Sequence, residues 1–204
     1  MYTPSFNRVA DRAVLIEAMQ AYPFAILFGL QDQTPVATHL PLVVKDEGPH
    51  GLLEGHFARA NRHGQALAGG ETLVVFCGPH SYVSPALYVD PLSVPTWNYI
   101  AVHACGTLSL VEDEAGKEEL LIGLIEANEP AFVEKWRAMP QDFRHEMLAG
   151  IVGFRIPIER IEGKFKLSQN RDPAERRGIR AAHAAGTPDQ QALAAWMARL
   201  GAQA

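Results

Sequence analysis

The sequence predicts an α+β protein built mainly of antiparallel strands. Short apolar runs follow one another between residues 24 and 111, and turn residues separate them. This spacing leaves no room for a crossover helix between each pair of strands, which favours an antiparallel sheet or barrel over a doubly wound parallel sheet. Segments with helical periodicity lie before and after this strand-rich region.

The first expected element is a helix over residues 12–22, with Asp11 as its N-cap and Pro23 at its end. The apolar runs that follow are expected to be strands, with hairpin turns at DQTP and DEGPHG. In chain order these runs are FAILFGL, PVATHLPLVV, GLLEGHF, TLVVFC and HACGTLSLV. The strand pattern resumes in GIVGFRIPIERIEGKFKL.

Further helices are expected in the second half of the chain and at one point among the strands. The expected ranges are about 60–68, 117–136, 143–148, 173–185 and 189–200. Asp172 before Pro173 is a typical start for the helix at 173–185, because the aspartate caps it and the proline fits its first turn. No repeat, low-complexity tract or long linker divides the chain. We therefore expect one domain over residues 1–204, with C-terminal helices at about 172–204.

Composition fits an ordinary globular protein. The 204 residues are 48% hydrophobic and 20% charged, which excludes a disordered, collagenous or coiled-coil chain. No signal sequence is evident, and no apolar run approaches the roughly 18 residues of a membrane span. Cys77 and Cys105 each lie in an apolar run without ligand spacing, so they are expected to be buried free thiols. These features predict a soluble, cytoplasmic protein in a reducing setting.

Charge is unevenly distributed along the chain. The net charge is −5, which gives the whole protein no cationic surplus for nucleic-acid phosphates. Residues 155–180, however, contain eight Lys or Arg against four acids, so this stretch is +4 and the remainder −9. Such a stretch could face a phosphate or a polyanion. A solvated helix surface is the commoner outcome.

No catalytic or metal-binding motif is present. Six of the eight histidines fall between residues 39 and 103, but their spacing matches no HExxH or other ligand pattern. The chain also lacks a GxSxG elbow and the glycine patterns of dinucleotide and P-loop sites. We therefore assign no catalytic residue and no metal ligand.

Three segments place polar side chains where a ligand could use them. GHFARAN leads from a strand into a helix, so Asn61 with His56 and the nearby arginines is a plausible phosphate seat. The simpler interpretation is that Asn61 caps the helix and His56 bonds locally. KLSQNR, at 166–171, ends the last strand with charged and amide groups, and it suits either a ligand or a surface turn.

The third segment, GPHSYVSPALYVDPLSVPTWNY, is expected to be a long loop between two strands. A loop of this length usually has a function or a partner that orders it. Trp97 and Tyr99 offer a flat apolar wall with polar edges, which suits an aromatic ring system. They could equally cover the core or a dimer interface.

Six blocks in order carry a resemblance to a known family. They are ATHLP, GHFARAN, FCGPHSYVSP, VPTWNY followed by AVHACG, GIVGF and KLSQNR. From Met1 to about Arg171 the chain resembles the PaiB-like family of FMN-binding negative transcriptional regulators. The resemblance implies an FMN-binding split β-barrel with peripheral helices, and a homodimer with flavin at the subunit interface.

The resemblance also implies a set of flavin-binding residues. Thr38 and His39 would lie along the flavin or its ribityl chain, and Trp97 and Asn98 beside the ring. The phosphate would lie at the turn from His56 to Arg62. The full implied set is Thr38, His39, His56, Asn61, Arg62, Trp97, Asn98, Lys166, Ser168, Gln169 and Asn170. Where the family often has proline after the Asn of GHxxxxN, this chain has Arg62, which could add a phosphate contact or alter the pocket.

Three functions follow from this resemblance. The first is a flavin-binding, cytoplasmic, homodimeric repressor, with direct DNA binding supported only by the basic stretch 155–180. The second is a small FMN-dependent oxidoreductase, in which the flavin supplies the electron chemistry. The third is a haem-binding protein, because related split barrels bind haem and this chain is rich in histidine.

Overall fold

The computed structural model describes residues 1–90 and 92–201. These residues group into two compact units, each assembled from separate stretches of chain. Unit 1 comprises Met1–Asp11, Cys77–Val102 and the chain from Glu162 onward, and unit 2 comprises Arg12–Phe76 and His103–Ile161. The strands over 71–83, 96–107 and 160–166 each contain a boundary between the two units. The single domain expected over 1–204 stays a prediction.

The strands form two antiparallel sheets, which confirms the expected α+β class. The order is β1-β10-β7-β6-β2-β3 in a six-stranded sheet and β4-β5-β9-β8 in a four-stranded sheet. The strands are β1 (Arg8–Val9), β2 (Phe24–Gln31), β3 (Thr34–Pro41), β4 (Val43–Lys45), β5 (Leu52–Ala58), β6 (Glu71–Val83), β7 (Thr96–Thr107), β8 (Ser109–Val111), β9 (Ile151–Pro157) and β10 (Arg160–Lys166).

The helices lie close to their expected positions. They are α1 (Arg12–Ala21), α2 (Arg62–Leu67), α3 (Glu114–Asn128), α4 (Phe132–Arg137), α5 (Gln141–Ala149), α6 (Pro173–Ala184) and α7 (Pro188–Gly201). Asp172 caps α6 as expected, because its Oδ1 accepts hydrogen bonds from the backbone N–H groups of Ala174 and Glu175. None of the helices in the described residues is long and apolar enough to cross a membrane.

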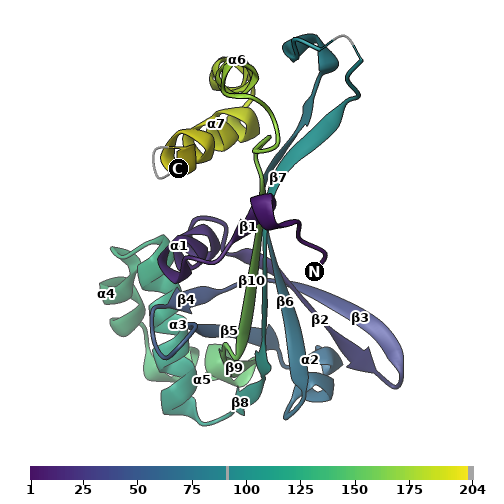
Figure 1. Ribbon diagram of the computed structural model, residues 1–204. Coiled ribbons are helices and arrows are strands. Elements are labelled where there is room, and N and C mark those ends of the chain that lie inside the picture. Colours follow the sequence, from purple (N-terminus) through teal and green to yellow (C-terminus); the bar gives the residue numbers. More distant parts are fainter. Residues whose placement is uncertain (91, 202–204) are drawn as a thin grey trace. The chain divides into compact units, whose positions relative to one another are not determined.

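Within unit 2, β2 and β3 form a hairpin at the expected DQTP turn. Gln31 pairs with Thr34, and both Asp32 (φ 50°) and Gln33 (φ 65°) adopt the left-handed conformation that a two-residue hairpin turn requires. The core of this unit contains the ring pair Phe57 and Phe154, whose centroids are 4.7 Å apart. Helices α3, α4 and α5 follow one another beside the four-stranded sheet (Figure 1).

Two expected elements are divided in the structure. The helix expected at 117–136 is two helices, α3 and α4, because Glu129 leaves the helical region (φ −148°, ψ 73°) before Pro130. The run PVATHLPLVV is two strands, β3 and β4. Between them Leu42 is buried, and its N–H donates to the carbonyl of Pro23 at 3.0 Å.

The loop expected at 78–99 is shorter than expected, because strand occupies both of its ends. β6 continues to Val83 and β7 begins at Thr96, with a 3-10 turn at Pro85–Leu87 between them. Alternating burial continues along the added part of β6, as expected for a strand. The same alternation leaves Cys77 exposed, so the expectation that it is buried was wrong, whereas Cys105 is buried as expected. Pro91 lies outside the described residues.

Candidate functional site

In unit 2, three polar side chains form a bonded cluster where β3 meets the start of α2. The Thr38 Oγ1 lies 2.8 Å from His63 Nδ1, and Asn61 Nδ2 donates to the same oxygen at 3.4 Å. The Asn61 Oδ1 accepts a hydrogen bond from the His63 backbone N–H at 3.0 Å. Asn61 therefore caps α2, as the simpler interpretation predicted, while its other amide atom orients Thr38.

His63 is the buried member of this cluster, at 1% exposure. Burial lowers the pKa of its imidazole, so the ring is neutral near pH 7. The contact between Thr38 Oγ1 and His63 Nδ1 fits either tautomer of the neutral ring, because a hydroxyl that accepts from Asn61 can still donate to Nδ1 or accept from it. The other polar atom of the ring is Nε2. This Nε2 is buried and has no hydrogen-bond partner among the residues described.

The other site residues expected in this unit lie around the cluster in different ways. His39 follows Thr38 on β3, and strand alternation places it on the exposed face, with its ring 6.3 Å from that of Phe24. His56 is half-buried on β5, opposite Gly153, and burial lowers its pKa. Arg62 is exposed at the first position of α2. The structure thus joins Thr38 to Asn61 but directs His39 to the opposite face of β3.

Unit 1 contains a cavity of about 390 Å³ at the KLSQNR segment. Its walls come from the N-terminal segment, the loop before β7, the start of β7, β10 and the turn after β10. The lining residues are Tyr2, Pro4, Phe6, Asn7, Tyr88, Val94, Pro95, Thr96, Tyr99, Lys164, Lys166, Ser168, Asn170 and Arg171. Three of the expected site residues, Lys166, Ser168 and Asn170, are therefore together in one cavity of the size that small ligands occupy.

Three cations line this cavity, and no carboxylate is among its described lining residues. The Lys164 ammonium donates to the Tyr2 carbonyl at 3.1 Å and lies 5.4 Å from the ring centroid of Tyr99. The Lys166 ammonium donates to the Thr96 hydroxyl. Cations beside aromatic rings suit a ligand that carries both an anionic group and an aromatic ring system.

The Arg171 guanidinium is stacked against the cavity wall. It lies 3.7 Å from the ring centroid of Tyr88 and donates to the Ser93 hydroxyl at 3.3 Å. Arg171 also forms an ion pair at 3.8 Å with the buried carboxylate of Glu175, which accepts the Val89 N–H at 2.9 Å. The Tyr88 hydroxyl is buried and has no hydrogen-bond partner among the described residues. Tyr88 is thus a residue of the cavity lining with a buried, unpartnered hydroxyl.

The turn after β10 is held in place by hydrogen bonds to buried groups beside the cavity. Ser168 is buried with a φ of 61°, and its hydroxyl donates to Asn98 Oδ1 at 3.1 Å. Asn98 is fully buried, and its Nδ2 has no partner within the described chain. The Gln169 side chain folds back, accepting the Leu167 N–H at 2.7 Å and donating to the Phe165 carbonyl. Asn98 and Gln169 therefore hold the turn, and neither lines the cavity.

Trp97 is outside the cavity lining. Its ring is half exposed and lies 6.1 Å from that of His80 and 6.2 Å from that of Tyr82, in an aromatic group on the outer face of β6 and β7. The aromatic wall of the cavity is supplied instead by Tyr99, together with Tyr2 from the N-terminal segment.

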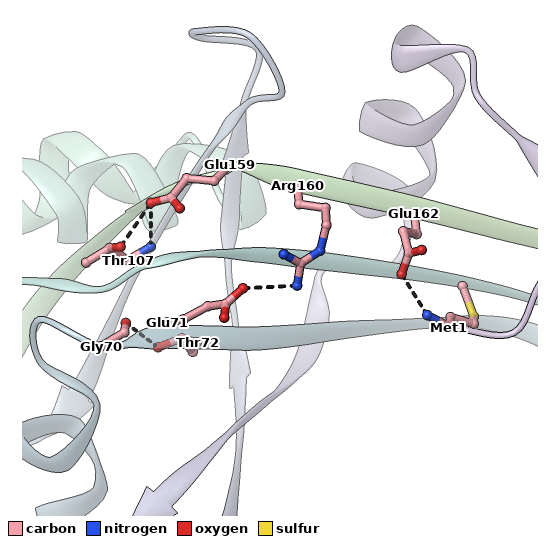
Figure 2. Close-up of polar contacts among 8 residues, drawn as sticks. All are labelled: Met1, Gly70, Glu71, Thr72, Thr107, Glu159, Arg160 and Glu162. Carbon is pink, nitrogen blue, oxygen red and sulfur yellow. Dashed lines mark hydrogen bonds and ion pairs between the residues drawn. The ribbon is translucent and has the colours of Figure 1, made fainter.

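Sequence reasoning missed the N-terminal part of the cavity, which is formed by Tyr2, Pro4, Phe6 and Asn7. The segment is positioned by long-range contacts, which local patterns do not reveal. Glu162 pairs with the N-terminal ammonium of Met1 at 2.7 Å, as Figure 2 shows. The available signal was two aromatic residues in MYTPSF outside any periodic element.

The polar ties of unit 2 drawn in the same figure belong to a different region. The Glu159 carboxylate accepts hydrogen bonds from both the N–H and the hydroxyl of Thr107, and Arg160 pairs with Glu71 at 3.0 Å (Figure 2). They attach the start of β10 and the residue before it to residues of β7 and β6. Within residues 1–90 and 92–201, no three His, Cys, Asp or Glu side chains are grouped to hold a metal ion.

A family model described as "Putative FMN-binding domain" matches residues 1–160. The chain belongs to this family. One relative is "Protease synthase and sporulation protein PAI 2" of Bacillus subtilis, which is 35% identical over 180 residues, covering 86% of this chain and 85% of that protein. An uncharacterized protein of Emericella nidulans is 27% identical over 223 residues, covering 88% of each. The PaiB-like resemblance is thereby confirmed.

Two solved structures have the same fold as this chain. The flavocytochrome Anf3 from Azotobacter vinelandii matches with a TM-score of 0.66 and 17% identity, covering 85% of this chain and 76% of that chain. The FAD and heme binding protein from Mycobacterium smegmatis matches with a TM-score of 0.63 and 18% identity, covering 89% and 81%. These likenesses confirm the split-barrel fold class.

The residues present fit FMN. A flavin mononucleotide carries a phosphate and an aromatic ring system, and the unit 1 cavity offers cations, a hydroxyl, tyrosine rings and the unpartnered Tyr88 hydroxyl. In unit 2, the unpartnered His63 Nε2 marks a second buried polar group, bonded through Nδ1 to the expected site residue Thr38. The family match supports FMN as the cofactor that the resemblance implies.

Proposed function

We propose that this chain is an FMN-binding negative transcriptional regulator of the PaiB type that acts as a homodimer in the cytoplasm. The observation that carries the proposal is the unit 1 cavity, where Lys164, Lys166 and Arg171 meet tyrosine rings without a competing carboxylate among the described lining residues. When bound, FMN supplies a ring system that can take up and release electrons.

The chain's own residues bind and orient this cofactor. Lys166, Ser168 and Asn170 offer donors from the turn after β10, and Asn98 fixes Ser168 from behind. We assign the second set, Thr38, His39, His56, Asn61 and Arg62, to the flavin on the basis of the family resemblance. Trp97 and Gln169 complete the proposed set, Gln169 by holding the turn.

An exposed apolar sheet face supports the homodimer. Along β2 the outward side chains Phe24, Phe28 and Leu30 are 61%, 38% and 59% exposed. Their neighbours on β3 across this face are Pro41, Ala37 and Pro35. Soluble monomers rarely expose a continuous apolar surface of this kind, so we propose that a second copy covers it. His39 lies on the same face, which supports a flavin site at the interface between copies.

The cofactor is tested by the absorption spectrum of freshly purified protein. We expect the bands of an oxidised flavin, released on denaturation as FMN. A colourless protein that still binds nothing after incubation with excess FMN would refute flavin binding. Anaerobic reduction of the flavin by NADH or NADPH would favour the oxidoreductase, and a Soret band on titration with hemin would favour a haem protein.

The dimer is tested by sedimentation velocity of the FMN-loaded protein. Phe28→Glu places a charge on the β2 face and is expected to shift a dimer to monomer. Phe143→Glu on α5, at a side chain that is also exposed, is the matched control and should leave the dimer intact. A wild-type monomer, or equal effects of both variants, would contradict the proposed interface.

Transcript levels with and without the gene test the repressor role.

A further inference from the structure

Three arginines gather on the C-terminal helix pair of unit 1. Arg176, Arg177 and Arg180 all lie on α6, and all three line a cleft of about 270 Å³ against the end of α7. Arg177 and Arg180 also line a second cleft of about 530 Å³ between the two helices, which pack against each other (Figure 1). We call these two spaces the arginine clefts.

The three charges are unneutralised within the described chain. Arg155, Arg160 and Arg171, from the same basic stretch of sequence, form ion pairs with carboxylates. Arg176, Arg177 and Arg180 form no ion pair or hydrogen bond among the described residues, and no acid is among the described residues that line either cleft.

The acids nearest in sequence are already occupied. Asp172 accepts two backbone N–H groups as the cap of α6, and Glu175 is buried against Arg171 and the Val89 N–H. Neither residue is among the described lining residues of the arginine clefts. The patch is therefore a local cationic surface on a chain of net charge −5.

The remaining lining of the larger cleft is small. Apart from the two arginines and Gln191, it consists of the alanines Ala181, Ala184, Ala194, Ala195 and Ala198. Methyl groups leave the helix backbones open to close approach, while the long arginine side chains reach outward from the same surface. This combination suits an extended anion that lies along the helix pair.

We propose that α6 and α7 bind the sugar-phosphate backbone of double-stranded DNA through Arg176, Arg177 and Arg180. The inference rests on the proposed regulatory function and names its partner and contact surface. Guanidinium groups bind phosphate oxygens in a two-point geometry that lysine lacks. Arg176 and Arg180 are four residues apart, about 6 Å along a helix axis, and phosphates two steps apart on one strand differ by roughly 7 Å along the duplex axis.

The negative charge of the rest of the chain favours DNA contact through the α6–α7 surface alone. Outside residues 155–180 the sequence sums to −9, which would repel a phosphate backbone. Gln191 is the one amide side chain among the described lining residues of the larger cleft, so the contact positions the protein on the duplex and contributes little base specificity. Three phosphate contacts per chain predict a slope of about −3 for log affinity against log salt, or about −5 for a dimer.

The test is fluorescence anisotropy of a labelled 20-base-pair duplex from the gene's own upstream region, with FMN-loaded full-length protein at several salt concentrations. We expect binding at low salt with the stated slope. R176Q/R177Q/R180Q should weaken binding at least tenfold and flatten the slope. The control R8Q/K135Q/R137Q removes three exposed cations elsewhere, and it should stay within about twofold of wild type.

Several outcomes would overturn the inference. Absence of binding by the wild-type protein would do so, as would equal losses in the two triple variants, which would indicate a net-charge effect. Displacement of the duplex by a 5′-mononucleotide at equal phosphate concentration would show a site for small phosphates. R177Q/R180Q keeps the half-buried Arg176 and repeats the test if the triple variant is unstable by thermal melting.

Flavin content separates this inference from the proposed function. We expect R176Q/R177Q/R180Q to retain its FMN spectrum, and loss of FMN would instead assign the arginines to the cofactor phosphate and overturn the DNA site. A wild-type protein that holds FMN and alters transcript levels but binds no duplex would overturn the DNA contact alone.

Discussion

Asn61 shows how one side chain serves the fold and a proposed ligand site together. Its oxygen caps α2 through the His63 N–H, and its nitrogen holds the Thr38 oxygen that in turn faces His63 Nδ1. Removing the amide would remove both the hydrogen bond to the His63 N–H and the hydrogen bond to Thr38 Oγ1. A change at this residue therefore affects the shape of the cluster as well as any contact with FMN.

We predict that Asn61→Ala weakens FMN binding by tenfold or more and lowers the free energy of unfolding by about 1 kcal/mol, the usual cost of a lost cap. Titration of the apoprotein with FMN and urea unfolding measure the two effects. Asn128→Ala is the control, because that amide only donates to the Leu124 carbonyl at the exposed end of α3. Equal FMN affinities in both variants would count against the assignment of Asn61.

At the scale of elements, the packing of β2 against α2 depends on a glycine. A Cβ built on Gly29 would lie 1.9 Å from Leu67 Cδ2 and 3.4 Å from His63 Nε2. A side chain at this position would have to displace the buried Leu67 side chain of α2. The strand therefore needs glycine here for close approach to α2, the helix that contains His63 and is capped by Asn61.

We predict that Gly29→Ala lowers the free energy of unfolding by about 1–3 kcal/mol, because the added methyl group overpacks the contact with Leu67. Gly123→Ala is the matched control. It adds the same methyl group within α3, where nothing lies within 4 Å, and should raise stability by up to about 1 kcal/mol. Urea midpoints compare the two, and a Gly29→Ala protein as stable as wild type would contradict the packing argument.

Elements with strong local patterns were predictable from sequence. Short apolar runs bounded by turn residues located β2 and β5, and the capping pair Asp172–Pro173 located the start of α6. The length of β6 was missed because Gly78 and Pro79 are typical turn residues. In the structure Gly78 permits close approach, since a Cβ there would lie 2.9 Å from the Ile100 Cβ.

The site was only partly predictable for a similar reason. The polar KLSQNR segment marked one wall of the cavity, because consecutive polar side chains at a strand end are visible in the sequence. The opposite wall comes from Tyr2 and Phe6, which are brought there by contacts with Glu162 and Lys164 more than 150 residues away. Local patterns contain no information about such pairings.

For the whole molecule, three histidines link stability to pH. Burial lowers the pKa values of His56, His63 and His183, so each is harder to protonate in the folded protein than in the unfolded chain. The unfolded state therefore binds more protons below the ordinary histidine pKa of about 6.5. The contribution of these histidines to the free energy of unfolding is therefore fully present above that pH, and it is lost progressively as the pH falls below it.

We predict that the free energy of unfolding decreases between pH 7.5 and pH 5.5, by at most about 1.4 kcal/mol per pH unit for each of these histidines. His183→Leu removes one of the three groups from a buried position on α6 and should make the decrease smaller. His50→Gln is the control at a histidine that is not buried. Urea unfolding across this pH range measures the effect, and a steeper decrease in His183→Leu would contradict it.

The position of β3 at the end of the six-stranded sheet also bears on how a newly made chain avoids aggregation. An edge strand offers free backbone groups to any other strand, and the outward face of β2 beside it is apolar. Pro35 and Pro41 lie near the two ends of β3, and proline has no N–H to donate. Strand addition is thereby limited to the short stretch between the two prolines, which reduces the tendency of a newly made chain to aggregate through this edge.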